Sequence, residues 1–219
     1  MVSTEVFEEF LPADIVKSSA FVGVFHFENT YWPVVIPSRR KSAKPHECLV
    51  TIPKPILVQL ADDEDKFPLY LELWQSCYDY GHKFKKIITN KSFASSGIEL
   101  LRIGNKALES AVAQCLKGGD GAIESSRLAI ELFAKSILAI KGNYNKEQLS
   151  QYDVLLSNSL QFLTYECRQI IKNDNLDQIN LHMVTVMRLD GQSQKPEDVR
   201  YAYTLAQHLA ATAVNILSE

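Results

Sequence analysis

The chain has 219 residues, of which 46% are hydrophobic and 22% charged, a composition that is typical of a folded globular protein and excludes a disordered one. Its net charge of -3 provides no overall attraction to nucleic acid or to an anionic membrane, so either would need a local basic patch. No window approaches about 18 consecutive apolar residues, and the acidic N-terminus lacks a secretory pattern. We therefore expect a cytoplasmic protein without a membrane span.

The first 90 residues contain the segments that favour extended structure. Residues 21–27 and 31–37 are aromatic and β-branched runs on either side of a turn that contains Asn29, which predicts an antiparallel hairpin. Two further short apolar runs, 48–52 and 56–60, are predicted as strands. Residues 1–90 are thus expected to form a small α+β region.

This region is predicted to end with a long helix from about residue 67 to about residue 88. The acidic run 62–65 precedes it, and carboxylates are favourable at the positive end of the helix dipole. Tyr70, Trp74 and Tyr78 recur at a spacing of four residues, which gives the helix an aromatic face. The polar segment 90–97 then indicates a hinge between two parts of the chain.

Residues 95–219 are expected to form a helical bundle, because apolar side chains recur there every three to four residues. The predicted helices are 98–116, 121–142, 149–171 with a break near 157–159, 176–188, and 196–217. The last of these is rich in alanine, and small residues allow helices to approach closely. The predicted fold class is therefore α+β and mainly α, with a bundle of four to five helices following a few antiparallel strands and one long helix.

The sequence of the bundle resembles that of the HEPN domain family. The run AIELFAKSIL at 129–138 is similar to the second-helix signature of that family, and residues 199–210 resemble its closing helix. The resemblance covers residues 95–219. It implies a bundle that is often dimeric and that serves as a metal-independent ribonuclease, as a non-catalytic partner of a nucleotidyltransferase, or as a ligand-binding module. RNA and a nucleotidyltransferase-type protein are the partners that it implies.

Catalytic members of that family carry an Arg and, four to six residues later, a His, and this chain departs from the pattern. Its nearest candidates are Arg200 and His208, which have seven residues between them. Eight steps along a helix leave two side chains about 80° apart around the axis and about 12 Å apart along it. We therefore expect that the two do not converge on one phosphate within a subunit.

Two basic clusters are candidates for nucleic-acid binding, and each also has an ordinary structural interpretation. The first is Arg39, Arg40 and Lys41, and the second is Lys83, Lys85 and Lys86. Close in space and beside aromatic rings, they would bind phosphate backbones. Otherwise the first is a solvated loop, and the second is a basic helix end that complements the dipole.

Other polar motifs predict no metal and no cofactor. The pairs His46/Cys48 and Cys77/His82 lack the close spacing of a zinc site, and no glycine-rich phosphate loop is present. The four cysteines lie mostly in apolar segments and are expected to be buried, reduced thiols. Arg127, Glu131 and Lys135 are spaced for ordinary surface pairs along one helix.

Two hypotheses for the function follow. The first is a non-catalytic HEPN-like binding or interaction module in a nucleic-acid-linked, stress or defence context. It would act as a homodimer that associates through its alanine-rich last helix. The alternative is a divergent metal-independent endoribonuclease that uses Arg200 and His208. The spacing of these two residues argues against an enzyme.

Overall fold

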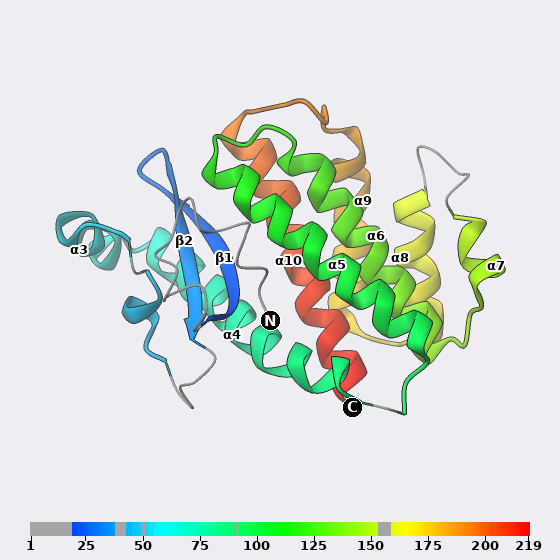
Figure 1. Cartoon of the computed structure of the whole chain (residues 1–219). Coiled ribbons are helices and arrows are strands. Elements are labelled where there is room, and N and C mark those ends of the chain that lie inside the picture. The colour runs from blue at the N-terminus through cyan, green and yellow to red at the C-terminus, as the bar shows by residue number, and fades with distance from the viewer. Residues whose placement is uncertain (1–18, 38–42, 50, 91, 153–158) are drawn as a thin grey trace.

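The computed structural model describes residues 19–37, 43–49, 51–90, 92–152 and 159–219. In these residues the fold is mainly helical, with a two-stranded antiparallel sheet near the N-terminus, which confirms the predicted fold class (Figure 1). The hairpin lies on one side of the molecule and the bundle on the other. No helix in the described part of the chain has the length and apolar character that a bilayer span requires.

The predicted hairpin consists of β1 (Ser19–Phe27) and β2 (Thr30–Pro37). Its strands are joined by the two residues Glu28 and Asn29, and Phe27 faces Thr30 across the turn. Both turn residues have positive φ, at 50° and 56°, which matches the twist of the flanking strands. Adjacent side chains such as Phe21 and Val22 are both buried, so the hairpin is covered on both faces.

The prediction of strands at 48–52 and 56–60 was wrong. The chain instead forms a short 3₁₀ turn η1 (Pro45–Cys48) followed by the helix α3 (Lys54–Asp62). Pro53 is the N-cap of α3 and Pro55 lies in its first turn. Backbone N–H groups in the first turn have no partner within the helix, so the N–H that proline lacks removes no hydrogen bond there. The prolines that were taken to separate two strands therefore begin a helix.

The long helix α4 (Lys66–Ile88) agrees closely with its predicted range. It begins where the Asp63 carboxylate accepts hydrogen bonds from the backbone N–H groups of Asp65 (3.0 Å) and Lys66 (2.7 Å). These bonds satisfy donors that the first turn of a helix leaves unpaired. Of its predicted aromatic face, Tyr70 is buried, whereas Trp74 and Tyr78 are half-buried.

The bundle contains the predicted helices, except that two helices, α7 and α8, stand where one range, 149–171, was predicted. Residues 153–158, between these two helices, include part of the predicted break and fall outside the described residues. The helices are α5 (Ser95–Leu116), α6 (Ala122–Lys141), α7 (Lys146–Ser150), α8 (Ser159–Ile170), α9 (Asp174–Arg188) and α10 (Pro196–Ser218). The turn between α5 and α6 uses Gly118 and Gly119 at positive φ, a conformation that side chains with a Cβ rarely adopt.

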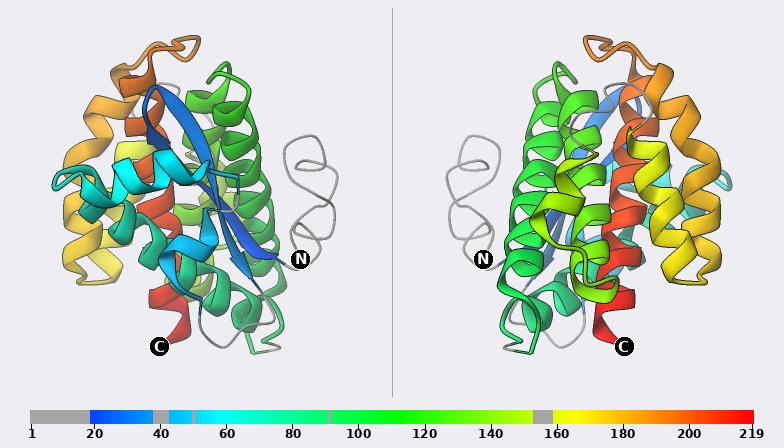
Figure 2. Two further views of the ribbon diagram at one scale, coloured as in Figure 1. Left: turned by 90° about the vertical axis from the view of Figure 1, so that its left-hand side faces the viewer. Right: turned by 90° about the vertical axis from the view of Figure 1, so that its right-hand side faces the viewer.

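The last helix, α10, is the centre of the fold. Figure 2 shows it between the pair α5–α6 and the pair α8–α9, and it also contacts α4. Four of its alanines, Ala202, Ala206, Ala210 and Ala213, are fully buried within the chain. The alanine face expected to bind a second copy is therefore already covered by helices of the same chain.

One hydrophobic core joins the two parts of the chain on either side of the predicted hinge. It is continuous from the hairpin through α4 to the helices of the bundle. Tyr80 of α4 illustrates the connection, because its ring contacts Phe21 of β1 and Phe133 of α6 at centroid distances of 4.7 and 6.1 Å. The hairpin and α4 are therefore positioned directly on the bundle.

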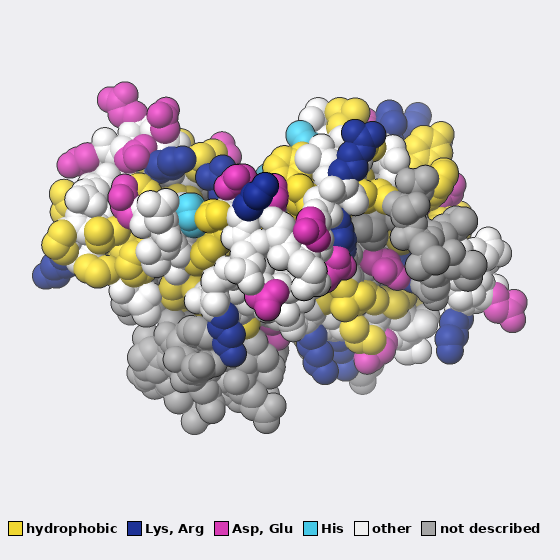
Figure 3. Space-filling view, turned by 90° about the horizontal axis from the view of Figure 1, so that it is seen from above, with side chains coloured by type: hydrophobic (Ala, Val, Ile, Leu, Met, Phe, Trp, Pro, Cys, Tyr) yellow, Lys and Arg dark blue, Asp and Glu magenta, His cyan; other side chains and the backbone are white. Residues whose placement is uncertain are grey.

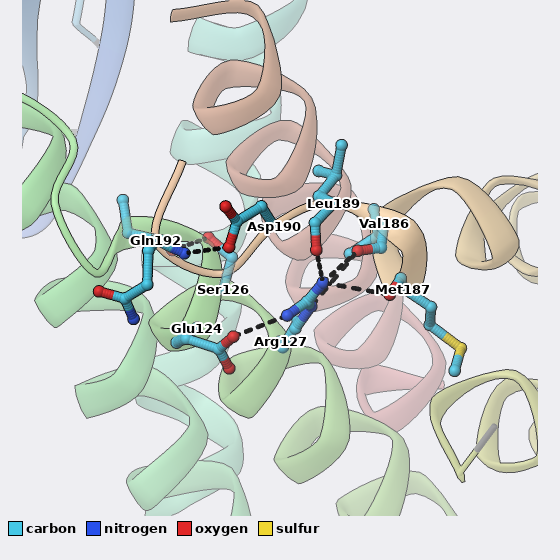
Figure 4. A network of polar contacts seen from close by, with 9 residues as sticks. Glu124, Ser126, Arg127, Val186, Met187, Leu189, Asp190 and Gln192 are labelled. Atoms are coloured by element: carbon cyan, nitrogen blue, oxygen red, sulfur yellow. Dashed lines mark hydrogen bonds and ion pairs between the residues drawn. The ribbon is translucent and has the colours of Figure 1, made fainter. Parts of the chain in front are cut away.

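Arg127 of α6 stabilises the end of α9 rather than forming the predicted pair with Glu131 (Figure 4). Its Nη2 donates to the carbonyl oxygens of Val186 (2.8 Å) and Leu189 (2.6 Å), and its Nη1 donates to Glu124 (2.7 Å). The last carbonyls of a helix lack intrahelical donors and carry partial negative charge, so a guanidinium is favourable there. Glu131 instead pairs with the buried Lys135.

We predict that Arg127→Met lowers the free energy of unfolding by about 1.5–3 kcal/mol, because it leaves carbonyls of α9 without their charged donor. Urea unfolding followed by circular dichroism would measure this loss. Arg168→Met is the matched control, since Arg168 is about half exposed and pairs with an equally exposed Asp177. The control should lose less than about 1 kcal/mol. Equal losses in both variants would contradict the capping role.

Candidate functional site

A cavity of about 490 Å³ lies between the hairpin, the first half of α4 and the first half of α10, and we call it the hairpin cavity. Its size is in the range of sites for small molecules. Apolar and aromatic side chains form much of its wall, including Leu69, Leu73, Tyr31 and Tyr201. The charged and titratable side chains that line it are His26, Lys66, Glu72, Glu197, Arg200 and His208.

The view from above in Figure 3 shows side chains of both charge signs where the hairpin side of the molecule meets the bundle. Acidic side chains gather separately at the outer end of that side. The polar groups of the hairpin cavity come from three elements, β1, α4 and α10, that are far apart in the sequence. The tertiary fold alone brings them together.

Arg200 and His208, the two residues singled out in the sequence, both line the hairpin cavity. They have different electrostatic neighbours within it. The charge of Arg200 acts on His26 and Tyr31, whereas His208 lies within the influence of Glu72 and His182. The two side chains therefore share one cavity, and no hydrogen bond joins them in the described part of the chain.

His26 lies on the cavity wall beside two cations. Its Nε2 is buried and has no hydrogen-bond partner among the described residues, and its ring packs on Tyr31 at a centroid distance of 4.8 Å. Burial lowers the pKa of His26, and the positive charges of Arg200 and Lys66 lower it further. The imidazole is therefore neutral at pH 7 in the unliganded chain.

His208 lies at the other end, where the hairpin cavity adjoins a second cavity of about 550 Å³. Both cavities are lined by Glu72 and His208. Partial desolvation lowers the pKa of the exposed His208, Glu72 opposes this effect, and His182 adds to it. His182 reaches the wall of the hairpin cavity as well, through a hydrogen bond of 2.7 Å between its Nδ1 and the Tyr201 hydroxyl.

Tyr203 connects the hairpin to α10 at the floor of the cavity. Its hydroxyl accepts a buried hydrogen bond of 3.1 Å from the backbone N–H of Val24 in β1. Burial raises the pKa of Tyr203 well above its ordinary value, so the hydroxyl stays protonated. This bond connects two of the elements that line the site.

Of the predicted basic clusters, the described residues Lys83, Lys85 and Lys86 do not line the hairpin cavity. Arg39, Arg40 and Lys41 lie outside the described residues. Lys83 is half-buried and donates to Asn215 Oδ1 at 2.6 Å, which connects α4 to α10. Lys85 and Lys86 are exposed in the last turn of α4, the position at which cations complement the helix dipole. Lys83 thus forms a bond between two helices, and Lys85 and Lys86 occupy positions that complement the helix dipole.

The cysteines are buried and free, as predicted. Burial raises the pKa of Cys115 to about 12 and also raises the pKa values of Cys77 and Cys167, so these thiols are protonated and unreactive at neutral pH. Within the described ranges, no three His, Cys, Asp or Glu side chains are grouped so that they could share a metal ion.

Sequence reasoning did not identify His26, Lys66, Glu72 or Glu197 as site residues. His26 offered one signal, because it is the titratable side chain inside an otherwise apolar and aromatic strand. Lys66 and Glu72 look like ordinary residues of an amphipathic helix, and nothing in the sequence places them opposite α10.

Comparison of the chain with protein-family models, with curated proteins and with solved structures finds no match.

We predict that Tyr203→Phe lowers the free energy of unfolding by about 1–3 kcal/mol, because the buried N–H of Val24 loses its acceptor. Hydrogen exchange at the Val24 amide should accelerate together with this loss. Tyr165→Phe, on an exposed tyrosine of α8, is the control and should be close to neutral. Unchanged exchange at Val24 would show that the hydrogen bond does not hold the hairpin.

Proposed function

We propose that this chain is a non-catalytic binding module whose ligand occupies the hairpin cavity. The observation that carries the proposal is the convergence of side chains from β1, α4 and α10 on one cavity of about 490 Å³. A pocket with apolar walls and a few convergent polar groups is the usual form of a small-molecule site. The resemblance of residues 95–219 to HEPN domains supports a nucleic-acid-linked, stress or defence context.

The dimensions and chemistry of the cavity suit a ligand of nucleotide size. Tyr31 and Tyr201 provide aromatic surface for a planar ring, and Glu72 and Glu197 provide acceptors for amino and hydroxyl groups. Binding rather than catalysis is favoured by the arrangement of the titratable groups. Arg200 and His208 have separate neighbours, and neither histidine of the cavity forms a hydrogen bond to a carboxylate in the described structure.

A homodimer, which the family resemblance implies, stays part of this proposal. It would use a surface other than the buried alanine face of α10. Light scattering on the purified chain would measure the mass of the particle against the 24.7 kDa of one chain.

The alternative function is a divergent metal-independent ribonuclease. One observation supports it, namely that Arg200 and His208 line the same cavity despite their long spacing. In that chemistry the guanidinium would stabilise phosphate charge and the imidazole would transfer protons. Against it stand the different neighbours of the two side chains.

The binding function predicts that a nucleoside or nucleotide stabilises the chain. We expect at least one of the four ribonucleosides or their 5′-phosphates to raise the melting temperature, because a ligand that binds only the folded state stabilises it by mass action. Thr204→Trp would fill the cavity and abolish the increase. Thr185→Trp, on the exposed side of α9, is the matched control and should retain it. No increase with any compound would refute the proposed ligand.

A second experiment separates binding from cleavage. We expect purified protein to leave mixed RNA intact during incubation with a metal chelator, because no hydrogen bond joins Arg200 and His208 among the described residues. Gel electrophoresis of the RNA would show this. Cleavage that disappears in His208→Ala would establish the ribonuclease instead, whereas cleavage that persists in that variant would indicate a contaminating nuclease.

A further inference from the structure

We propose that His26, Lys66 and Arg200 form an anion subsite that holds the phosphate group of the ligand in the hairpin cavity. The inference rests on the proposed binding function and names the chemistry of the ligand, a phosphate monoester on a planar, partly apolar body. The three side chains come from β1, from the first residue of α4 and from the first half of α10.

The cations of this subsite form no ion pair with any residue that the structure describes. Neither the Lys66 ammonium nor the Arg200 guanidinium forms an ion pair with another residue in the part of the chain that the structure describes. Both line the same cavity, and both act on His26 with positive charge. Two cations without a bonded partner at one concave site can attract an anion, although Glu72 and Glu197 also line the cavity and the whole chain is acidic.

The buried Nε2 of His26 is a second, independent sign of a ligand. A buried polar atom without a partner is rare in folded proteins and calls for an explanation. An anion oxygen in the cavity would supply the missing partner to an Nε2–H donor. It would also offset the repulsion from Lys66 and Arg200 that now disfavours the imidazolium.

The remaining charges give the cavity two different ends. Of the two carboxylates, Glu72 acts on His208, whereas Glu197 acts on Tyr31, whose ring packs on His26. The group of His26, Lys66 and Arg200 thus has one carboxylate in its neighbourhood, and the part of the cavity near Glu72 and His208 is suited to hydroxyl and amino groups. Leu69, which is half exposed, and Tyr201 also line the cavity. A phosphate at one end of a planar, partly apolar molecule matches this order.

Phosphate suits the subsite better than a carboxylate does. The planar fork of Arg200 can donate two parallel hydrogen bonds to phosphate oxygens, and Lys66 provides a compact point charge. A dianion with three equivalent oxygens can accept bonds from all three side chains at once. A planar carboxylate has only two oxygens and one charge to share among them.

The first test uses inorganic phosphate as the probe and NMR titration of the His26 imidazole as the readout. In the wild-type chain, phosphate should raise the pKa of His26 by about one pH unit or more, since a bound anion stabilises the imidazolium. Arg200→Gln should remove this response. An unchanged His26 titration in the presence of phosphate would overturn the subsite, and this measurement on the wild-type chain does not depend on a variant folding.

The second test compares a nucleoside with its 5′-monophosphate by calorimetry. The wild-type chain should prefer the monophosphate, and Lys66→Gln and Arg200→Gln should each reduce that preference about tenfold to a hundredfold, the range for a charge-assisted hydrogen bond. Lys141→Gln on α6 and Arg102→Gln on α5 are exposed controls outside the cavity and should leave the preference unchanged.

The outcomes distinguish this inference from the proposed function. Binding of nucleosides with no preference for the monophosphate would retain the module and refute the subsite. A rise in the pKa of His26 with inorganic phosphate, combined with no binding of any nucleoside or nucleotide, would retain the subsite and refute the nucleotide-sized ligand.

Discussion

The contact between β1 and α10 is the constraint on which the site depends. Val24 donates its N–H to the Tyr203 hydroxyl, and Gly23 beside it allows the strand to lie directly against two helices. A Cβ at position 23 would lie 2.7 Å from Cys77 Sγ of α4, closer than real Cβ contacts, and 3.1 Å from the Tyr203 hydroxyl, which is a tight contact. The absence of a side chain there therefore allows the strand to pack closely against α4 and α10.

The central position of α10 explains how one helix serves both the core and the site. Its small buried residues allow α5, α6 and α9 to approach, while Arg200 and His208 remain exposed toward the hairpin side. Seven residues lie between Arg200 and His208, which places the two side chains at different points along the same helix. A cavity that extends along α10 can therefore include both, although one phosphate group would not contact both.

Periodicity identified most of the secondary structure because each helix has a buried stripe. The ranges of α4, α6, α9 and α10 agree with the predicted ones to within a few residues. The error at 48–60 arose because short apolar runs fit strands and helices equally well. Two prolines decided the outcome, since they suit the start of α3 and exclude a central strand.

The amino-acid sequence by itself determined the fold class, the hairpin and its turn, and the order of the helices along the chain. These features depend on the local spacing of apolar residues and on turn residues such as Asn29. Only the tertiary structure decided that His26, Lys66 and Arg200 line one cavity, and that Arg127 caps α9. Each of these arrangements joins elements that are distant along the chain. The identity of a lysine on an amphipathic helix is the same whether it faces solvent or an anion site, so local pattern cannot distinguish the two.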